Sequence, residues 1–272
     1  MSERTLLAVL AHPDDESFLC GGTLARYAAA GVRVVLACAT RGEAGEIAAP
    51  ALASRETLAT VRERELHAAA VVLGLAQVHL LGYPDGQLSE VPFLDGVQRV
   101  AALLAEIQPA VVITLGPEGV YGHADHVMVH RWTKEAFYQW RVAQGLDPAT
   151  PGRGPQRLYY CAPPRSWYRA VSERTRARGL PDRYGPRLAV LGVPDELVTT
   201  QIDVAAYAPV RLAAIRAHQT QLPADHPFRV LPDADLHELL ATEWFTRAWA
   251  PFAPEAPRET DLFGAAGSAP AG

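Results

Sequence analysis

The chain contains 272 residues, of which 49% are hydrophobic and 20% are charged, and its formal net charge is −5. This apolar content excludes a disordered chain, and no stretch approaches the roughly 18 consecutive apolar residues that span a bilayer. The charge lacks the basic excess that marks nucleic-acid-binding proteins. We therefore expect one large α/β domain over residues 1–250, with no nucleic acid or membrane partner, and a loose Pro/Ala/Gly-rich tail over residues 251–272.

The cysteines and the first residues both favour a cytoplasmic protein. Cys20, Cys38 and Cys161 are too few and too far apart in the sequence for a disulfide framework or a Cys-x-x-Cys metal site. The apolar run before His12 has only about six residues, which is shorter than the core of a signal peptide.

Four short apolar runs alternate with helical patterns in the N-terminal half. Runs of this length are typical of strands buried on both faces, and the alternation predicts a parallel sheet with right-handed crossovers and the strand order 3-2-1-4. The predicted strands are 6–11, 32–39, 77–81 and 110–115, and the predicted helices are 22–30, 54–73 (capped by Ser54 and closed by Gly74) and 91–108.

The C-terminal half is less regular. It shows helical patterns at 125–143 and 205–218, a Pro/Gly-rich loop at 145–156, and candidate strands at 157–161 and 199–203. We expect a Rossmann-like, mostly parallel sheet with helices on both faces, and an irregular C-terminal half that completes the pocket.

The predicted topology places two loops opposite each other. Strands 1 and 4 are neighbours in the order 3-2-1-4, and the crevice of such a sheet opens at the carboxyl ends of its strands. The loops that follow Ala11 and Leu115 should therefore face each other across this crevice.

The loop after the first strand reads His-Pro-Asp-Asp-Glu over residues 12–16. Adjacent carboxylates repel one another unless a cation offsets them, and imidazole with carboxylate suits zinc or iron(II). His12 and Asp15 are three residues apart, so that one turn of chain can direct both at a single ion. The alternative is a solvated acidic start of the next helix, favoured by the helix dipole.

The loop after the fourth strand contains His123, Asp125 and His126. One histidine from this loop would complete a His-Asp-His set with an open position for water, as in catalytic metal sites. His126 and His130 could instead form a pair on the helix, although His130 lies deeper along it, and packing in the core or at the surface is the remaining alternative. The residues alone do not decide which of the two aspartates after Pro13 binds the ion.

Other catalytic classes lack their motifs. There is no GxGxxG after the first strand, no GxxxxGK[ST] and no GxSxG. Dinucleotide binding, P-loop chemistry and serine hydrolysis are therefore disfavoured.

Together these motifs resemble the LmbE/PIG-L family of zinc-dependent N-acetylglucosaminyl deacetylases. The resemblance is carried by AHPDDE, the following GGTLARYAAAGVRVVL, and HADH after the fourth strand. It runs from about residue 6 to residue 221 and includes RERELHAAAVVLGL, YPDG and AHQTQ.

The resemblance implies a metal site and its catalytic groups. Zinc, with iron(II) as the alternative, would be bound by His12, Asp15 and His126. Asp14 would be the general base for the attacking water.

The remaining catalytic roles implied by the resemblance fall on the loop after the fourth strand. His123 would stabilise the oxyanion and protonate the leaving amine, oriented by Asp125, and Tyr121 would reach the substrate carbonyl when its loop closes.

The resemblance also implies substrate contacts. Arg62 and Asp85 match positions that hold sugar hydroxyls, with Arg64 competing for the first role. A threonine replaces the more usual serine in AHQTQ, and a substrate or supporting role is implied for His218 or Gln221.

An arginine-rich segment extends from Arg153 to Arg187. It holds nine arginines against two acidic residues, Glu173 and Asp182. One hypothesis is recognition of an anionic aglycone, which within the family would favour a sugar linked to malate over one linked to inositol. The alternative is a solvated or subunit-contacting face.

We therefore expect a zinc-dependent N-deacetylase that acts on an N-acetylglucosaminyl small molecule, such as the malate or inositol conjugate of low-molecular-weight thiol synthesis. This amino-sugar conjugate is the expected partner, and self-association into a homo-oligomer stays open. The alternatives are an amidase acting on a thiol conjugate and a non-catalytic carbohydrate-binding protein of the same fold. Binding alone would not need Asp14, His123 or Asp125, which disfavours the last alternative.

Overall fold

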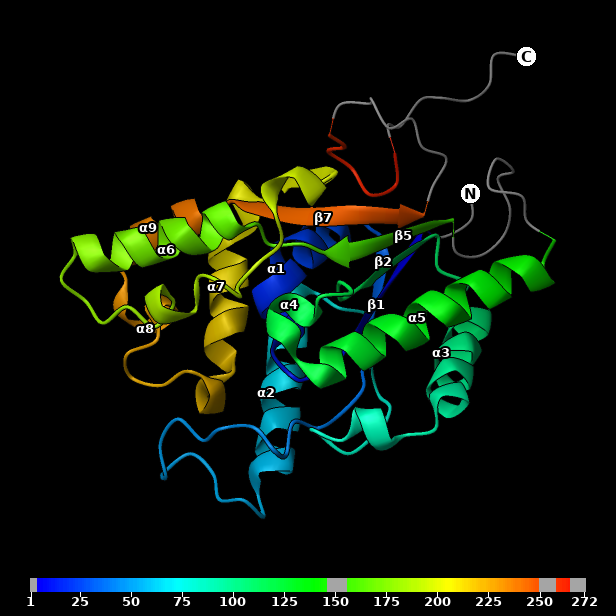
Figure 1. Cartoon of the computed structure of the whole chain (residues 1–272), viewed down its shortest axis with the longest axis horizontal. Helices are drawn as coiled ribbons and strands as arrows, with labels where there is room; N and C mark the ends of the chain where they lie inside the picture. The colour runs from blue at the N-terminus through cyan, green and yellow to red at the C-terminus, as the bar shows by residue number, and fades with distance from the viewer. Residues whose placement is uncertain (1–3, 146–155, 250–257, 265–272) are drawn as a thin grey trace.

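A computed structural model describes residues 4–145, 156–249 and 258–264 of the chain. Within these residues seven strands form one sheet in the order β3-β2-β1-β4-β5-β7-β6 (Figure 1). The strands are β1 (Thr5–Leu10), β2 (Arg33–Cys38), β3 (Gln77–Leu80), β4 (Val111–Thr114), β5 (Arg157–Cys161), β6 (Thr200–Asp203) and β7 (Thr242–Trp249).

The parallel part of the sheet confirms the predicted order. β1 pairs in parallel with β2 on one side and with β4 on the other, and β3 and β5 extend these pairs in parallel. β7 then runs antiparallel to both β5 and β6. Every residue of β1 is buried, as expected for an apolar strand at the centre of a sheet covered on both faces.

The helices form two groups. α1, α2 and α7 pack together, whereas α3 packs against α5, and Figure 1 shows α3 and α5 side by side, away from α2 and α7. The connection from β3 to β4 runs back across the sheet, so that a right-handed crossover places α3 on the face opposite α1 and α2. The helices are α1 (Asp15–Ala29), α2 (Leu58–Leu73), α3 (Phe93–Ile107), α4 (Gly119–Gly122), α5 (Ala124–Ala143), α6 (Arg165–Ala177), α7 (Ala208–Ala217), α8 (Pro227–Val230) and α9 (Asp233–Leu239).

Two predicted helix starts were wrong. α1 begins at Asp15 and not at residue 22, because the carboxylate of Asp15 accepts the backbone N–H groups of Ala11 and His12 and turns the chain directly from β1 into the helix. α2 begins at Leu58, and Ser54 does not cap it. The Ser54 hydroxyl donates to Glu56 instead.

Residues 258–264 are not loose, which corrects the expectation for this part of the tail. Leu262 is fully buried and its backbone N–H donates to the Tyr27 hydroxyl at 2.7 Å. Phe263 lies under the Arg4 guanidinium, 4.1 Å from the ring centre, so that the two described ends of the chain meet. The rest of the predicted tail, and residues 146–155 of the predicted Pro/Gly loop, lie outside the described residues. The single domain expected over residues 1–250 stays a prediction.

The three cysteines are buried thiols. The hydrogen bond with the neighbouring Cys161 thiol, followed by burial, raises the pKa of Cys20, which favours the interpretation of Cys20 as a small core residue over a reactive one. Among the helices that the structure describes, none is both long enough and apolar enough to cross a membrane.

Candidate active site

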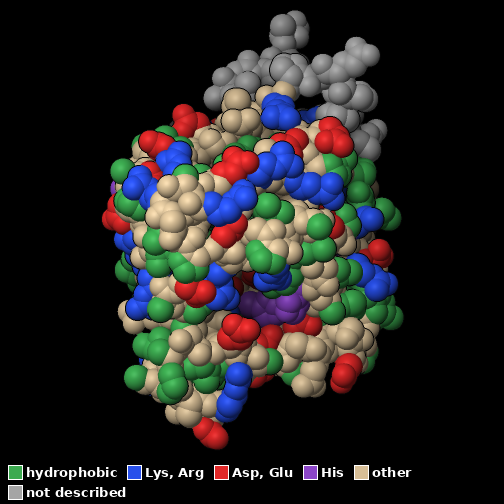
Figure 2. Space-filling model, turned by 60° about the vertical axis from the view of Figure 1, so that its left-hand side comes forward, with side chains coloured by type: hydrophobic (Ala, Val, Ile, Leu, Met, Phe, Trp, Pro, Cys, Tyr) green, Lys and Arg blue, Asp and Glu red, His purple; other side chains and the backbone are tan. Residues whose placement is uncertain are grey.

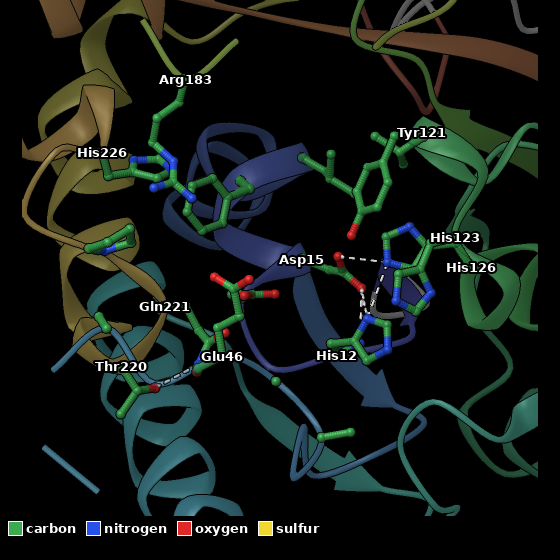
Figure 3. A pocket seen from close by; sticks show the side chains of 18 of the residues that line it. His12, Asp15, Glu46, Tyr121, His123, His126, Arg183, Thr220, Gln221 and His226 are labelled. Atoms are coloured by element: carbon green, nitrogen blue, oxygen red, sulfur yellow. Dashed lines mark hydrogen bonds and ion pairs between the residues drawn. The ribbon is translucent and has the colours of Figure 1, made fainter. Parts of the chain in front are cut away.

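The three predicted metal ligands converge at the carboxyl ends of β1 and β4. His12 Nδ1 lies 3.2 Å from His126 Nε2, and the carboxylate oxygens of Asp15 lie 3.8 Å from His12 Nδ1 and 3.4 Å from His126 Nε2 (Figure 3). All three residues are buried. The two loops predicted to face each other therefore do so, because β1 and β4 are adjacent and parallel.

Asp15 is held as a carboxylate. Burial alone would raise its pKa, but the imidazoles of His126 and His12 and two backbone N–H groups outweigh that effect and lower it. An ionised oxygen ligand beside two imidazole nitrogens is a donor set that suits zinc or iron(II).

His12 Nε2, the other ring nitrogen, contacts two carboxylates. His12 Nε2 lies 3.0 Å from Asp85 Oδ1 and 3.3 Å from Asp125 Oδ2. Although burial opposes the charge, these two carboxylates raise the pKa of His12 to about 10. In metal sites such a carboxylate fixes the imidazole tautomer and orients the other nitrogen at the ion. Here that nitrogen is Nδ1, which faces the other two donors, so the residues present fit a metal ion.

Two sets of ligand atoms lie within 4.8 Å of one another in the described residues: His12 with His123 and His126, and His12 with Asp85 and Asp125. The first set shares both imidazoles with the predicted one. The alternative pair of His126 with His130 is in neither of these two sets.

Asp14 has a strained backbone and a partly buried side chain. Its φ of 127° lies in the left-handed region that side-chain-bearing residues rarely adopt. The Glu16 carboxylate accepts its backbone N–H at 3.0 Å, and Arg62 Nη2 donates to its Oδ2 at 3.1 Å. Burial, opposed by Arg62, raises the pKa of Asp14 to about 6, which suits a general base at neutral pH.

The loop after β4 places Tyr121, His123 and His126 together. The Tyr121 ring lies edge-on to both imidazoles, with centroids 5.7 Å from His123 and 5.6 Å from His126. Val120, which precedes it, has a φ of 66°, so this loop also carries backbone strain. Tyr121 remains 39% exposed and borders the cavity.

Asp125 contacts His123 through its backbone. The Asp125 N–H donates to His123 Nδ1 at 3.2 Å. The carboxylate accepts the N–H groups of Gly86 and Leu88, at 2.7 and 3.1 Å, besides facing His12. Asp125 therefore joins the turn after β3 to the start of α5, which no local sequence pattern could reveal.

The predicted substrate-binding residues lie around the same cavity. Arg62 is buried in its wall, whereas Arg64 is exposed on α2. Asp85 lines the cavity while its Oδ2 accepts the Ala44 N–H at 2.8 Å. Gln221 also lines it, and its Nε2 donates to the Glu46 carbonyl at 3.0 Å.

The cavity has a volume of about 640 Å³ and extends well past the histidine cluster. Figure 2 shows the histidines in a hollow bordered by basic and acidic side chains. The C-terminal half forms part of its wall, as predicted, through Tyr168, Arg183, Arg187 and His226. A cavity of this size can enclose one small molecule that contains no more than a few rings.

Sequence reasoning missed one buried pair beside the site. His218 Nε2 lies 2.7 Å from Glu16 Oε1, and both side chains are at most 1% exposed. The AHQTQ motif pointed to His218 but could not identify its partner, which lies 202 residues away.

Comparison with known proteins identifies the family. The PIG-L family model, described as GlcNAc-PI de-N-acetylase, matches residues 7–137. The chain is 36% identical to the 1D-myo-inositol 2-acetamido-2-deoxy-alpha-D-glucopyranoside deacetylase of Thermobispora bispora, over 90% of this chain and 88% of the relative. It is also 36% identical to the protein of the same name from Thermobifida fusca, over 97% of this chain and 100% of the relative.

Solved structures show the same fold at lower identity. The N,N'-diacetylchitobiose deacetylase from Pyrococcus horikoshii superposes with a TM-score of 0.63 at 20% identity, covering 93% of this chain and 88% of that one. The length of the match to the curated relatives, rather than this fold similarity, decides the family. The chain belongs to the PIG-L (LmbE-like) family of de-N-acetylases.

Proposed function

We propose that this protein is a metal-dependent hydrolase that removes the acetyl group from an N-acetylglucosaminyl small molecule and releases acetate and a free amine. The observation that carries the proposal is the convergence of His12, Asp15 and His126 beside the partly buried Asp14 in one cavity. The curated relatives, which match nearly the whole chain, are named as deacetylases of an inositol conjugate of this kind. We propose Zn²⁺ as the ion, because two imidazoles and one carboxylate with an open position are typical of catalytic zinc.

The metal would be held by His12 Nδ1, His126 Nε2 and the Asp15 carboxylate. When bound, it supplies a Lewis acid that polarises the amide carbonyl and makes water more acidic. Asp85 and Asp125 hold His12 from its Nε2 side, so that its ligating nitrogen keeps one orientation.

Asp14 is proposed to accept the proton of the attacking water. Arg62 binds one carboxylate oxygen of Asp14 and so limits its rotation. The Asp14 backbone is fixed by the hydrogen bond to Glu16. These contacts position the base at the edge of the cavity without a further conformational step.

His123 is proposed to donate a hydrogen bond to the oxyanion. Its Nδ1 accepts the Asp125 N–H, so that in the neutral ring the proton resides on Nε2. A donor fixed in this way stabilises charge that develops on the amide oxygen. The imidazolium form of the same histidine is proposed to protonate the leaving nitrogen, after the ring has received the proton that Asp14 removes from the attacking water. Tyr121 is proposed to contact the substrate carbonyl. Arg62, Asp85 and Gln221 are proposed to contact the sugar.

The proposal is tested by measuring acetate release from N-acetylglucosaminyl inositol, malate, phospholipid and chitobiose substrates, with the bound metal quantified in the same preparation. We expect stoichiometric zinc and chelator-sensitive release from at least one amino-sugar substrate. Metal-free protein that retains its activity in chelator would overturn the mechanism. Turnover of a thiol conjugate alone would favour the amidase alternative, and sugar binding without turnover would favour the binding protein.

A further inference from the structure

A chain of hydrogen bonds extends from the backbone of Asp14 to the C-terminal end of α7. The Asp14 N–H donates to Glu16 Oε2 at 3.0 Å. The other carboxylate oxygen of Glu16, Oε1, lies 2.7 Å from His218 Nε2 and accepts the Ser17 hydroxyl at 2.5 Å. His218 directly follows α7, and α7 packs against both α1 and α2. The Glu16 carboxylate therefore connects the proposed general base to a helix of the C-terminal half.

The backbone of Asp14 depends on outside contacts because it is strained. Its φ of 127° and ψ of −30° lie outside the regions that residues with side chains favour, and such a conformation persists only where its surroundings hold it. The Asp14 carbonyl is fixed by α1, since it accepts the N–H groups of Ser17 and Phe18. The Asp14 N–H is held by Glu16, and its carboxylate is held by Arg62 at 3.1 Å. The contact with Glu16 is therefore the one that opposes a change in φ.

Glu16 and His218 lie outside the cavity that Asp14 lines. Neither belongs to the described side chains that form the cavity wall, and neither is more than 1% exposed. Among the described residues His218 Nδ1 has no hydrogen-bond partner, so that the ring is held there through Nε2 alone. Without His218, Glu16 Oε1 would keep only the Ser17 hydroxyl, and the side chain of Glu16 could rotate away from the Asp14 N–H.

We propose that His218 is a positioning residue for Asp14. Its Nε2 donates to Glu16, and Glu16 in turn holds the Asp14 N–H, so that the Asp14 carboxylate faces the cavity before the substrate binds. The inference rests on the proposed function, since it assumes that Asp14 accepts the proton of the attacking water. A base held in advance lowers the barrier of the chemical step and adds no affinity for the substrate.

The candidate metal ligands are held by other contacts. The Asp15 carboxylate accepts the N–H groups of Ala11 and His12, at 3.1 and 2.9 Å. His12 is held by two carboxylates on its Nε2 side. Loss of the His218 contact should therefore lower kcat, while KM and the affinity for the metal stay close to those of wild type.

The test compares two amide variants that differ by one methylene group. In His218→Gln the amide nitrogen reaches the place of Nε2 and can donate to Glu16, whereas in His218→Asn it reaches only the place of Nδ1. With N-acetylglucosaminyl inositol and zinc-loaded enzyme, kcat for acetate release should fall about tenfold or more in His218→Asn, because a misplacement of about 1 Å can lower a rate about 100-fold. His218→Gln should keep kcat to within about threefold of wild type, and KM and zinc affinity, measured by chelator titration, should stay within about threefold in both variants.

A control variant separates positioning from loss of stability. Glu243 forms another buried ion pair with α7, 2.9 Å from Arg211 Nε, and accepts the N–H groups of Gly22 and Thr23 in α1. Glu243→Gln leaves Arg211 buried without its counter-charge and should lower the free energy of unfolding in urea. It should leave kcat at the wild-type value, because Gly22 and Thr23 lie about two turns along α1 from Asp14.

Four results would overturn the proposal. They are an unchanged kcat in His218→Asn, equal losses of kcat in the two amide variants, an equal loss in Glu243→Gln, and a loss in His218→Asn that weaker zinc binding explains. If His218→Asn does not fold, Ser17→Ala takes its place, because it removes the other donor to Glu16 Oε1. A several-fold fall of kcat in that variant supports the proposal, and an unchanged kcat overturns it.

Failure of the proposed function is distinguishable from failure of this inference. If wild type releases no acetate from N-acetylglucosaminyl inositol, the proposed function fails for this substrate. Crystal structures of the two amide variants then decide the role of His218. A φ of Asp14 that stays near 127° in His218→Gln and leaves this region in His218→Asn supports positioning, and any other pair of results refutes it.

Discussion

Replacing His218 with leucine is expected to destabilise the fold by about 3 kcal/mol or more, because the Glu16 carboxylate loses its charged partner in the interior. Burial opposes both charges, yet each group shifts the other toward ionisation. The pKa of Glu16 is lowered and that of His218 is raised. At neutral pH the pair is therefore ionic, with Nε2 and Oε1 2.7 Å apart and neither side chain more than 1% exposed.

The magnitude follows from what remains around Glu16. Removing one partner of a buried pair costs roughly 3–5 kcal/mol. In the variant, Glu16 still accepts the Ser17 hydroxyl and the Asp14 N–H. These two hydrogen bonds partly solvate the carboxylate, so the lower end of the range is expected.

A matched double variant distinguishes the buried charge from simple loss of packing. Glu16→Gln with His218→Leu retains an acceptor for the Asp14 N–H but buries no charge. Its cost should be smaller than the sum of the two single costs by at least about 1 kcal/mol. Urea unfolding of the four proteins at pH 7 gives the four free energies. Single costs that add to within about 0.5 kcal/mol, or a His218→Leu cost below about 1 kcal/mol, would refute the reasoning.

Three further predictions concern the site. Asp14→Asn should keep the bound metal, measured by elemental analysis, and reduce acetate release by about 100-fold or more, because the proton acceptor is lost; unchanged turnover would remove Asp14 as the base. Asp125→Ala should weaken metal binding about 10- to 100-fold in a competitive chelator titration, because it releases His12 and leaves the Gly86 and Leu88 N–H groups without an acceptor. Acidification from pH 7 to pH 5 should cost wild type about 2 kcal/mol more than His226→Asn, which keeps an acceptor for the Phe228 N–H. In the unfolded chain His226 takes up a proton near its ordinary pKa of 6.5, whereas in the folded protein, where burial disfavours its charge, it does so only near 4, so stability is lost as the pH falls through this window. If the free energies of unfolding of wild type and variant, measured in urea, fall in parallel between pH 7 and pH 5, the low pKa of His226 is contradicted.

Much of the sheet could be predicted because its strands are recognisable in the sequence as short apolar runs. Continuous apolar runs such as that of β1 are buried on both faces, and the order of β3, β2, β1 and β4 follows from crossover handedness. That order alone brought His12 and His126 together. The arginine excess of the C-terminal half was equally visible in the sequence.

What could not be predicted depends on contacts between distant segments. Asp125 turns its carboxylate toward residues 86 and 88, which is a property of the packed loops and not of its neighbours in sequence. The start of α1 was predicted too late because Asp15, which was interpreted as a metal ligand in a loop, is also the first residue of the helix. Which of nine arginines reach the cavity depends on the short 3-10 helix at Gly185–Arg187, whose position the charge pattern does not encode.

The contact between Arg4 and Phe263 has a topological consequence. The first strand and the C-terminal segment end next to each other, since Arg4 directly precedes β1 and Leu262 is fully buried. A short linker across this contact would join the ends into a circle, which could then be opened at an exposed turn elsewhere. In such a circularly permuted chain, β1 would still lie at the centre of the sheet, with His12 at its carboxyl end. The residues that lead into β1 would then come from the C-terminal segment through the linker.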